Sequence, residues 1–224
     1  MATLYIVGTP IGNLEDVTLR ALRVLKEVDV ILCEDTRVTR RLLERYEIVG
    51  KHLSPYNELD SGQTAEKIIS WLGEGKNVAL VSDAGTPGIS DPGSMLVQSV
   101  REALPEVKIE SVPGPSALTA ALSIAGVPIH DFVFFGFLPH KKGRETLFKE
   151  IAESERTVVL YESPHRILKT LESLQKFSPE KQITVCRELT KIYEEVKKGT
   201  ASDLLLYYTS NPDKVKGEFV FIVS

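Results

Sequence analysis

Apolar and polar residues alternate in blocks along the first half of the chain, in the order expected of strands followed by helices. Four short β-branched runs predict strands, at residues 3–8, 29–34, 77–81 and 108–114. Stretches with apolar residues three or four positions apart predict amphipathic helices at 14–28, 39–48, 63–75 and 93–105. In the first of these helices the buried stripe would be Leu19, Leu22, Leu25 and Val28. This alternation predicts a mostly parallel sheet with helices on both faces.

The second half has a different pattern, with aromatic-rich strands and a larger share of antiparallel pairing expected. Strands are predicted at residues 132–137, 157–163, 182–189 and 217–224. Helices are predicted at residues 115–126, 146–154 and 166–177, and the segment 200–210 is left unassigned. Two prolines and a glycine at residues 112–115 interrupt the pattern. We therefore expect an α/β protein of two α/β domains, residues 1–113 and 114–224.

Composition narrows the class of protein without identifying it. The 224 residues are 42% hydrophobic and 26% charged, as in ordinary globular proteins, and the net charge of −4 provides no general attraction to polyanions. Cys33 and Cys186 lie far apart in apolar runs, so we expect buried, reduced thiols. Without a basic leader or an apolar run of about 20 residues, the sequence predicts a soluble, cytoplasmic protein.

Two basic clusters stand out against this acidic background. One contains Arg37, Arg40, Arg41 and Arg45, and the other His140, Lys141, Lys142 and Arg144. The second follows the aromatic run FFGF, where Phe137 and Leu138 are suited either to stacking on an unpaired base or to core packing. Each cluster is either a binding surface for phosphates or a solvated charged face.

Two loops that follow predicted strands are rich in glycine and proline. The loop SDAGTPGISDPG (82–93) follows a buried strand, and VGTPIGN (7–13) follows the first strand. Ligands of open α/β sheets bind at the carboxyl ends of strands, which favours a ligand site over ordinary turns. Neither loop contains GxGxxG or GK[ST], so a dinucleotide fingerprint and a P-loop are both excluded.

Three strand ends carry an acid beside an arginine. They are EDTR (34–37), ESPHR (162–166) and CRELTK (186–191), and together they suggest a polar cleft between the two halves. The alternative for the first is a helix cap, with Asp35 or Thr36 capping and Arg37 paired to a neighbour. His165 is either a proton acceptor or a structural hydrogen-bonding group. The histidine and cysteine spacings do not predict a metal site.

Seven segments, in their order along the chain, resemble the tetrapyrrole methylase superfamily, the class III S-adenosylmethionine-dependent methyltransferases. They are LYIVGTPIGNLEDVTLRA, ILCEDTR, SDAGTPGISDPG, VPGPSALTAALSIAG, FFGFLP, YESPHR and CRELTK. The combination of EDTR, SDAGTPGISDPG and ESPHR is similar to the branch that methylates small-subunit ribosomal RNA. Longer members of this branch continue past the last strand, where this sequence ends at FIVS.

The resemblance implies two α/β domains with the methyl donor, S-adenosyl-L-methionine, in the cleft between them. It implies methyl transfer to the ribose 2′-oxygen of a cytidine, either in free ribosomal RNA or in the assembled small subunit. It also implies a homodimer that needs no metal ion and does not bind a membrane. The implied donor-binding residues are Pro10, Ile11, Gly12, Asp83, Ala84, Gly85, Thr86, Ser116, Ala117 and Tyr161, with the region of Glu218 and Phe219. The implied catalytic residues are Glu34, Asp35, Arg37, Glu162, His165, Arg166, Arg187 and Lys191.

Among these residues the candidate bases are Glu34, Asp35, Glu162 and His165, and the acids of EDTR are favoured. The arginines would hold phosphate or pair with the acids, and Lys191 would assist. Asp83 would either place a charge near the donor or hold its loop in shape. Two other functions stay open: a methylase of a tetrapyrrole or other small molecule, and a non-catalytic RNA-binding module.

Overall fold

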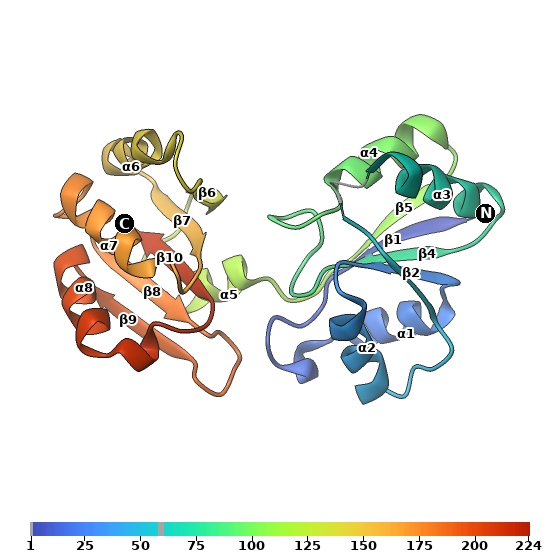
Figure 1. Ribbon diagram of the computed structural model, residues 1–224, viewed down its shortest axis with the longest axis horizontal. Coiled ribbons are helices and arrows are strands. Elements are labelled where there is room, and N and C mark those ends of the chain that lie inside the picture. The colour runs from blue at the N-terminus through green and yellow to red at the C-terminus, as the bar shows by residue number, and fades with distance from the viewer. Residues whose placement is uncertain (1, 58–60) are drawn as a thin grey trace. The chain divides into compact units, whose positions relative to one another are not determined.

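The computed structural model describes residues 2–57 and 61–224, which divide into two compact units, Met1–Ser116 and Ala117–Ser224 (Figure 1). We refer to them as the first and the second unit. Each consists of one five-stranded sheet with helices packed on it, so the predicted α/β class is confirmed.

The sheet of the first unit is entirely parallel, with the strand order β3-β2-β4-β1-β5. Its central strands are apolar on both faces, which is typical of a sheet covered by helices on both sides. The strands are β1 Thr3–Val7, β2 Val30–Cys33, β3 His52–Pro55, β4 Val78–Val81 and β5 Lys108–Val112.

Two pairs of helices cover the two faces of this sheet (Figure 1). The helices α1 (Leu19–Glu27) and α2 (Thr36–Arg45) pack on one face, where Leu25 and Leu43 join a core with Val7. The helices α3 (Ser61–Gly73) and α4 (Ser94–Ala103) pack on the other face. A short 3-10 helix, η1 (Leu14–Asp16), precedes α1.

The connections of the first sheet leave in opposite directions from two neighbouring strands. From β1 the chain crosses through α1 to β2, whereas from β4 it crosses through α4 to β5, on the other side of β1. The point between β4 and β1 is therefore a topological switch point, where open α/β sheets bind ligands.

The second unit has a mixed sheet with the order β6-β7-β10-β8-β9. Only β6 and β7 pair in parallel, and the other three pairs are antiparallel, as the aromatic-rich pattern predicted. The strands are β6 Phe132–Phe137, β7 Thr157–Glu162, β8 Ile183–Arg187, β9 Glu195–Gly199 and β10 Phe219–Val223. All five residues of the central strand β10 are buried.

Three helices of the second unit cover one face of its sheet, and one contacts the strand β10 separately. The helices α6 (Arg144–Glu153), α7 (Ile167–Phe177) and α8 (Ala201–Ser210) share a core with alternate residues of β7, β8 and β10. The helix α5 (Ala117–Ile124) contacts β10, and the short η3 (Pro212–Lys214) follows α8.

The structure corrects three details of the sequence analysis. The predicted helix 14–28 begins only at Leu19, because Thr18 caps it by accepting a hydrogen bond from the Ala21 amide. Leu19 is consequently 87% exposed, and the buried positions of α1 are Ala21, Val24 and Leu25. The predicted helix 39–48 begins three residues earlier, at Thr36.

The strands β3 and β9 were not predicted at all. Both lie at sheet edges and contain few apolar residues, with the sequences HLSP and EVKKG, and β9 alternates exposed and half-buried residues. The segment left open at 200–210 is helix α8 with a capping box, in which Thr200 and Asp203 bond each other's backbone amides.

Within residues 2–57 and 61–224, the helices are all too short or too polar to cross a membrane, and no cluster of side chains could hold a metal ion. Cys33 and Cys186 are both buried and free of disulfide bonds, as expected.

Candidate functional site

The loops that follow β1, β4 and β5 converge at the carboxyl edge of the first sheet. Thr9 and Gly85 exchange backbone hydrogen bonds of 2.8 and 3.1 Å, which join the first two loops across the switch point. The Thr9 hydroxyl also donates to the Ser82 carbonyl at 3.0 Å, and the Thr86 hydroxyl donates to the Pro115 carbonyl at 3.4 Å. The three glycine- and proline-rich segments therefore form one surface.

Gly8 and Gly114 make the closest backbone approach at this surface. The Gly8 amide donates to the Val112 carbonyl at 3.0 Å, and a Cβ atom on Gly114 would lie 2.7 Å from the Gly8 carbonyl oxygen. A Cβ atom on Gly8 would lie 2.8 Å from the Gly114 Cα. Only glycine fits at either position, which explains the glycines of VGTP and VPGP.

Gly85 has a left-handed backbone conformation, with φ of 91°. It lies between the loop after β1 and the loop after β5. A side chain at Gly85 would come within 3.5 Å of the Ile11 side chain and 3.7 Å of the Pro115 carbonyl. The fold thus brings together the expected donor-binding residues Ile11, Gly85 and Thr86. Pro10 and Ile11 are buried, whereas Gly12 is exposed.

Three carboxylates lie together where β2 and β4 end. One carboxylate oxygen of Asp83 accepts a hydrogen bond from the Asp35 amide at 3.0 Å, and the Asp83 amide approaches Glu34 at 3.4 Å. Asp83 therefore ties its own loop to the end of β2. Of the two roles left open for Asp83, its role in holding the loop is visible in these contacts.

The three carboxylates have different pKa values. Partial burial of the carboxyl group raises the pKa of Glu34, although the residue as a whole is exposed, and burial likewise raises the pKa of Asp83. Hydrogen bonds from the side chain and amide of Arg37 lower the pKa of Asp35 to about 2. Glu34 is thus better suited to accepting a proton near neutral pH than Asp35.

The capping interpretation of EDTR agrees with the geometry. Asp35 is the N-cap of α2 and accepts a hydrogen bond of 2.8 Å from the Arg37 amide, and the Arg37 guanidinium donates back to it at 3.0 Å. The helix then exposes Arg40, Arg41 and Arg45.

In the second unit, Glu162 is the centre of a buried ionic network. Glu162 is 1% exposed, and its carboxylate lies 2.7 Å from Arg166 Nε and 3.8 Å from Arg144 Nη2. Thr170 donates a hydrogen bond to it, and so does the Ser163 amide. Two candidate catalytic residues, Glu162 and Arg166, are thus satisfied by internal partners in this unit. The sequence analysis missed Arg144 and Thr170 as their partners, because spacing alone does not show which distant residues meet.

Tyr161 contacts the start of α5 and two aromatic rings. Its hydroxyl oxygen accepts a hydrogen bond of 3.1 Å from the Leu118 amide, next to the expected donor residue Ala117. Its ring meets Phe134 and Phe137 edge-on, at centroid distances of 4.9 and 5.5 Å.

The remaining candidates occupy separate environments. Arg187 is buried and donates to the carbonyls of Lys216 and Tyr193 at 2.9 and 3.1 Å. Lys191 pairs with Glu188 at 2.8 Å and Glu218 at 2.9 Å. His165 is exposed, and Ser116 is half-buried.

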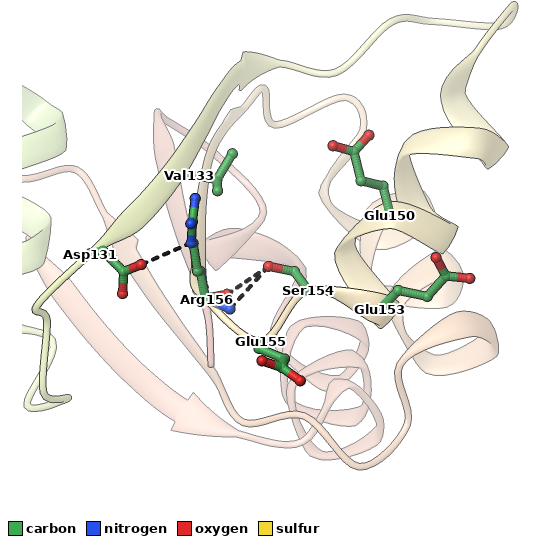
Figure 2. A pocket seen from close by; sticks show the side chains of 7 residues that line it. All are labelled: Asp131, Val133, Glu150, Glu153, Ser154, Glu155 and Arg156. Carbon is green, nitrogen blue, oxygen red and sulfur yellow. Dashed lines mark hydrogen bonds and ion pairs between the residues drawn. The ribbon is translucent and has the colours of Figure 1, made fainter.

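A hollow of about 570 Å³ lies in the second unit, at the end of its sheet away from Glu162 and Tyr161 (Figure 2). It sits where β6 and β7 begin, and its one cation, Arg156, pairs with Asp131 at 2.8 Å. The lining residues are Asp131, Val133, Glu150, Glu153, Ser154, Glu155 and Arg156. None of the predicted site residues lies in this hollow, and its acidic lining does not suit phosphates.

The carboxyl edge of the first sheet fits S-adenosylmethionine in two respects. The loop after β4 carries only small, half-buried side chains, Ala84 and Thr86, on either side of the buried Gly85, and these would obstruct a ligand little. The carboxylate of Asp83 belongs to the same loop and matches the positive charges of the sulfonium and ammonium groups.

Comparison with known proteins agrees with the resemblance seen in the sequence motifs. Residues 3–205 match the family described as Tetrapyrrole (Corrin/Porphyrin) Methylases. The Ribosomal RNA small subunit methyltransferase I of Thermotoga maritima is 44% identical over 225 residues, which cover 100% of this chain and 99% of that protein. The protein of the same name from Synechocystis sp. is 46% identical, covering 100% of this chain and 79% of that protein.

Solved structures share the fold. The methyltransferase CobJ superposes with a TM-score of 0.72 at 24% identity, covering 100% of this chain and 94% of the other. The uroporphyrin-III-C-methyltransferase from Thermus thermophilus superposes with a TM-score of 0.69 at 23% identity, with the same coverage. At these identities the likeness concerns the fold alone.

Proposed function

Because the chain belongs to the tetrapyrrole methylase family, and is an enzyme that uses S-adenosylmethionine, we propose that it methylates small-subunit ribosomal RNA. The acceptor is the ribose 2′-oxygen of a cytidine. The observation that carries this proposal is the 44% identity to a named ribosomal RNA methyltransferase over the whole of both chains.

In this proposal the donor is held by the loops that converge at the carboxyl edge of the first sheet. Ile11, Gly85 and Thr86 line it there, and Asp83 keeps the loop after β4 attached to the end of β2. The other residues that we propose to contact the donor are Ser116, Ala117 and Tyr161. We also propose that residues 1–113 and 114–224 act as two domains.

When bound, S-adenosylmethionine supplies a methyl group already activated by the positive sulfonium. The protein's task is then to position the acceptor hydroxyl, and such positioning supplies roughly 7–11 kcal/mol of barrier reduction. Glu34 accepts the hydroxyl proton, because its pKa is raised whereas Asp35 is committed to its helix cap. General-base assistance of this kind contributes about 10²–10⁴-fold. Arg37 and the other exposed arginines of α2 contact phosphates of the RNA.

The first experiment offers tritiated methyl donor to the purified protein with unmodified small ribosomal subunits, and separately with naked small-subunit RNA. We expect label in RNA that survives in an alkali-resistant dinucleotide, the signature of ribose 2′-O-methylation. Label that enters a tetrapyrrole instead, or no donor binding by calorimetry, would overturn the proposal. The better RNA substrate identifies the form that the enzyme recognises.

A pair of variants tests the assignment of the donor loop. Asp83→Ala should abolish binding of S-adenosylmethionine, because it releases the loop from β2, whereas Arg37→Ala should bind the donor normally and lose methyl transfer. Undiminished calorimetric binding by Asp83→Ala would show that the donor lies elsewhere.

The quaternary structure and cellular location belong to the same proposal. We propose a cytoplasmic homodimer, as the resemblance implies. Sedimentation velocity of the purified protein at micromolar concentration would give about twice the chain mass of 24.8 kDa if this is correct.

A further inference from the structure

We propose that the end of β6 and the loop that follows it, residues 137–143, bind an unpaired segment of the RNA substrate. Phe137 stacks on a base, and Lys141 and Lys142 contact the adjoining phosphates. This inference rests on the proposed function, since it names the part of the second unit that holds the RNA. We call residues 137–143 the β6 loop.

Phe137 is exposed because of a bulge in β6. The pairing with β7 shifts between Phe134 and Phe137, where Phe134 lies opposite Val159 and Phe137 lies opposite Tyr161. The strand therefore contains one extra residue, and Gly136 takes up the irregularity with φ of 60°. The bulge brings Phe137 edge-on to Tyr161 and leaves it 53% exposed. A rigidly supported aromatic face at a strand end suits base stacking.

In the second unit, the two ends of the strands β6 and β7 carry opposite charges. At the carboxyl ends of β6 and β7, His140, Lys141 and Lys142 are all exposed. At the amino ends of the same strands, the hollow in Figure 2 is lined by Glu150, Glu153 and other acids. The phosphates of a nucleic acid are attracted to the basic carboxyl ends and repelled from the acidic amino ends.

The β6 loop is held by the buried network around Glu162. Arg166 donates to the Leu138 carbonyl at 2.7 Å, and Arg144 donates to the Pro139 carbonyl at 3.4 Å. Both arginines face the Glu162 carboxylate, so the network fixes the first residues of the loop. A loop fixed in this way loses little conformational freedom when it binds. Glu162 is therefore a positioning residue for this surface.

The occupant follows from the combination of groups. A stacking face next to two lysines matches a base attached to its phosphates, and a base is free to stack only where the strand is unpaired. A duplex would offer phosphates to the lysines but no base to Phe137. The partner of the β6 loop is therefore single-stranded RNA.

The experiment compares variants of the purified enzyme for their KM and kcat with small-subunit RNA and for donor affinity by calorimetry. Phe137→Ala should raise the KM for RNA by about 5- to 150-fold, the range that loss of one stacked base gives, while donor affinity stays unchanged. Phe137→Tyr keeps the aromatic face and should restore the wild-type KM. The matched control is Phe132→Ala at the other end of β6, where the side chain is 39% exposed and lies at the acidic amino end of the strand.

The charge contribution is measured separately, with a variant that does not disturb the core. Lys141→Ala combined with Lys142→Ala should reduce the slope of log affinity against log salt by about 1.4, or about 0.7 for each lost phosphate contact on a single strand. Lys169→Ala, an exposed lysine on α7, is the control and should leave the slope unchanged.

The outcomes separate this inference from the proposed function. If the wild-type enzyme methylates RNA but these variants match their controls, the β6 loop does not bind RNA and the proposed function stands. If Phe137→Ala weakens donor binding and leaves the KM for RNA unchanged, Phe137 belongs to the donor site. If the wild-type enzyme neither binds nor methylates RNA, both proposals fail.

Discussion

Replacing Gly114 with alanine tests whether the converging loops of the first unit are as tightly constrained as they look. The added Cβ atom would lie 2.7 Å from the carbonyl oxygen of Gly8, 2.8 Å from its carbonyl carbon and 2.9 Å from its Cα. All three are backbone atoms, which cannot swing away like the end of a flexible side chain.

The cost follows from how far these backbones must separate. Non-bonded carbon atoms rest at about 3.5–4.0 Å, so the loops after β1 and β5 would have to move apart by roughly 1 Å. The hydrogen bonds from Gly8 to Val112 and between Thr9 and Gly85 resist this movement. Overpacking of this kind costs about 1–3 kcal/mol. Because the same loops line the proposed donor site, donor affinity should fall as well.

The chain offers both a local probe and a matched control. Its one tryptophan, Trp71, lies in the core of the first unit, so its fluorescence during urea denaturation reports the unfolding of that unit. Gly73→Ala is the control, because nothing lies within 4 Å of a Cβ atom there and alanine favours the helix. It should unfold at the same or a slightly higher urea concentration. If Gly114→Ala unfolds like the wild type and binds S-adenosylmethionine equally well, the steric argument is wrong.

Three further predictions concern ionisable groups. Glu34→Gln should lower kcat by about 10²–10⁴-fold without changing donor affinity, and it should remove the fall in kcat that the wild type shows as the pH drops through the raised pKa of Glu34; an unchanged acid limb would exclude Glu34 as the base. Glu162→Gln should lower the free energy of unfolding by about 3–5 kcal/mol, because it leaves Arg144 and Arg166 without their buried counter-charge, and wild-type stability in urea would contradict this. Burial raises the pKa of Cys186 from 9.0 to about 11, so the folded state keeps its proton where the unfolded state loses it, and stability should fall between pH 9 and 11. Cys186→Ala should show a smaller fall over the same range, and an identical pH profile would show that this thiol makes no contribution.

The main elements of the fold could be predicted because buried strands and amphipathic helices have clear patterns. The strands β1, β2 and β4 are continuous apolar runs, and their positions agree closely with the prediction. The edge strands β3 and β9 could not be found, because their sequences, HLSP and EVKKG, contain no run of apolar residues, unlike the edge strand β6. β9, with the sequence EVKKG, looks like a polar loop.

The site was only partly predictable for a different reason. Glycine-rich loops after buried strands indicated correctly where the backbone comes close, but the contact of Gly8 with Gly114 joins positions over a hundred residues apart. The three acid–arginine pairs looked alike in sequence and differ in the structure. Arg37 forms an exposed pair with its cap residue, Arg166 shares a buried carboxylate with Arg144, and Arg187 bonds backbone carbonyls. Only tertiary partners distinguish these environments.

The central position of β10 has a consequence for the synthesis of the protein. The first unit has all its strands once residue 112 has left the ribosome, so its sheet can form while the chain is still growing. The second sheet cannot, because β10 lies between β7 and β8 and is translated after both. Until Phe219–Val223 emerges, β7 and β8 each expose an unpaired apolar edge, the kind of edge that leads to aggregation. The nascent second unit therefore depends on its last strand, and this period of translation is when it most needs protection by chaperones.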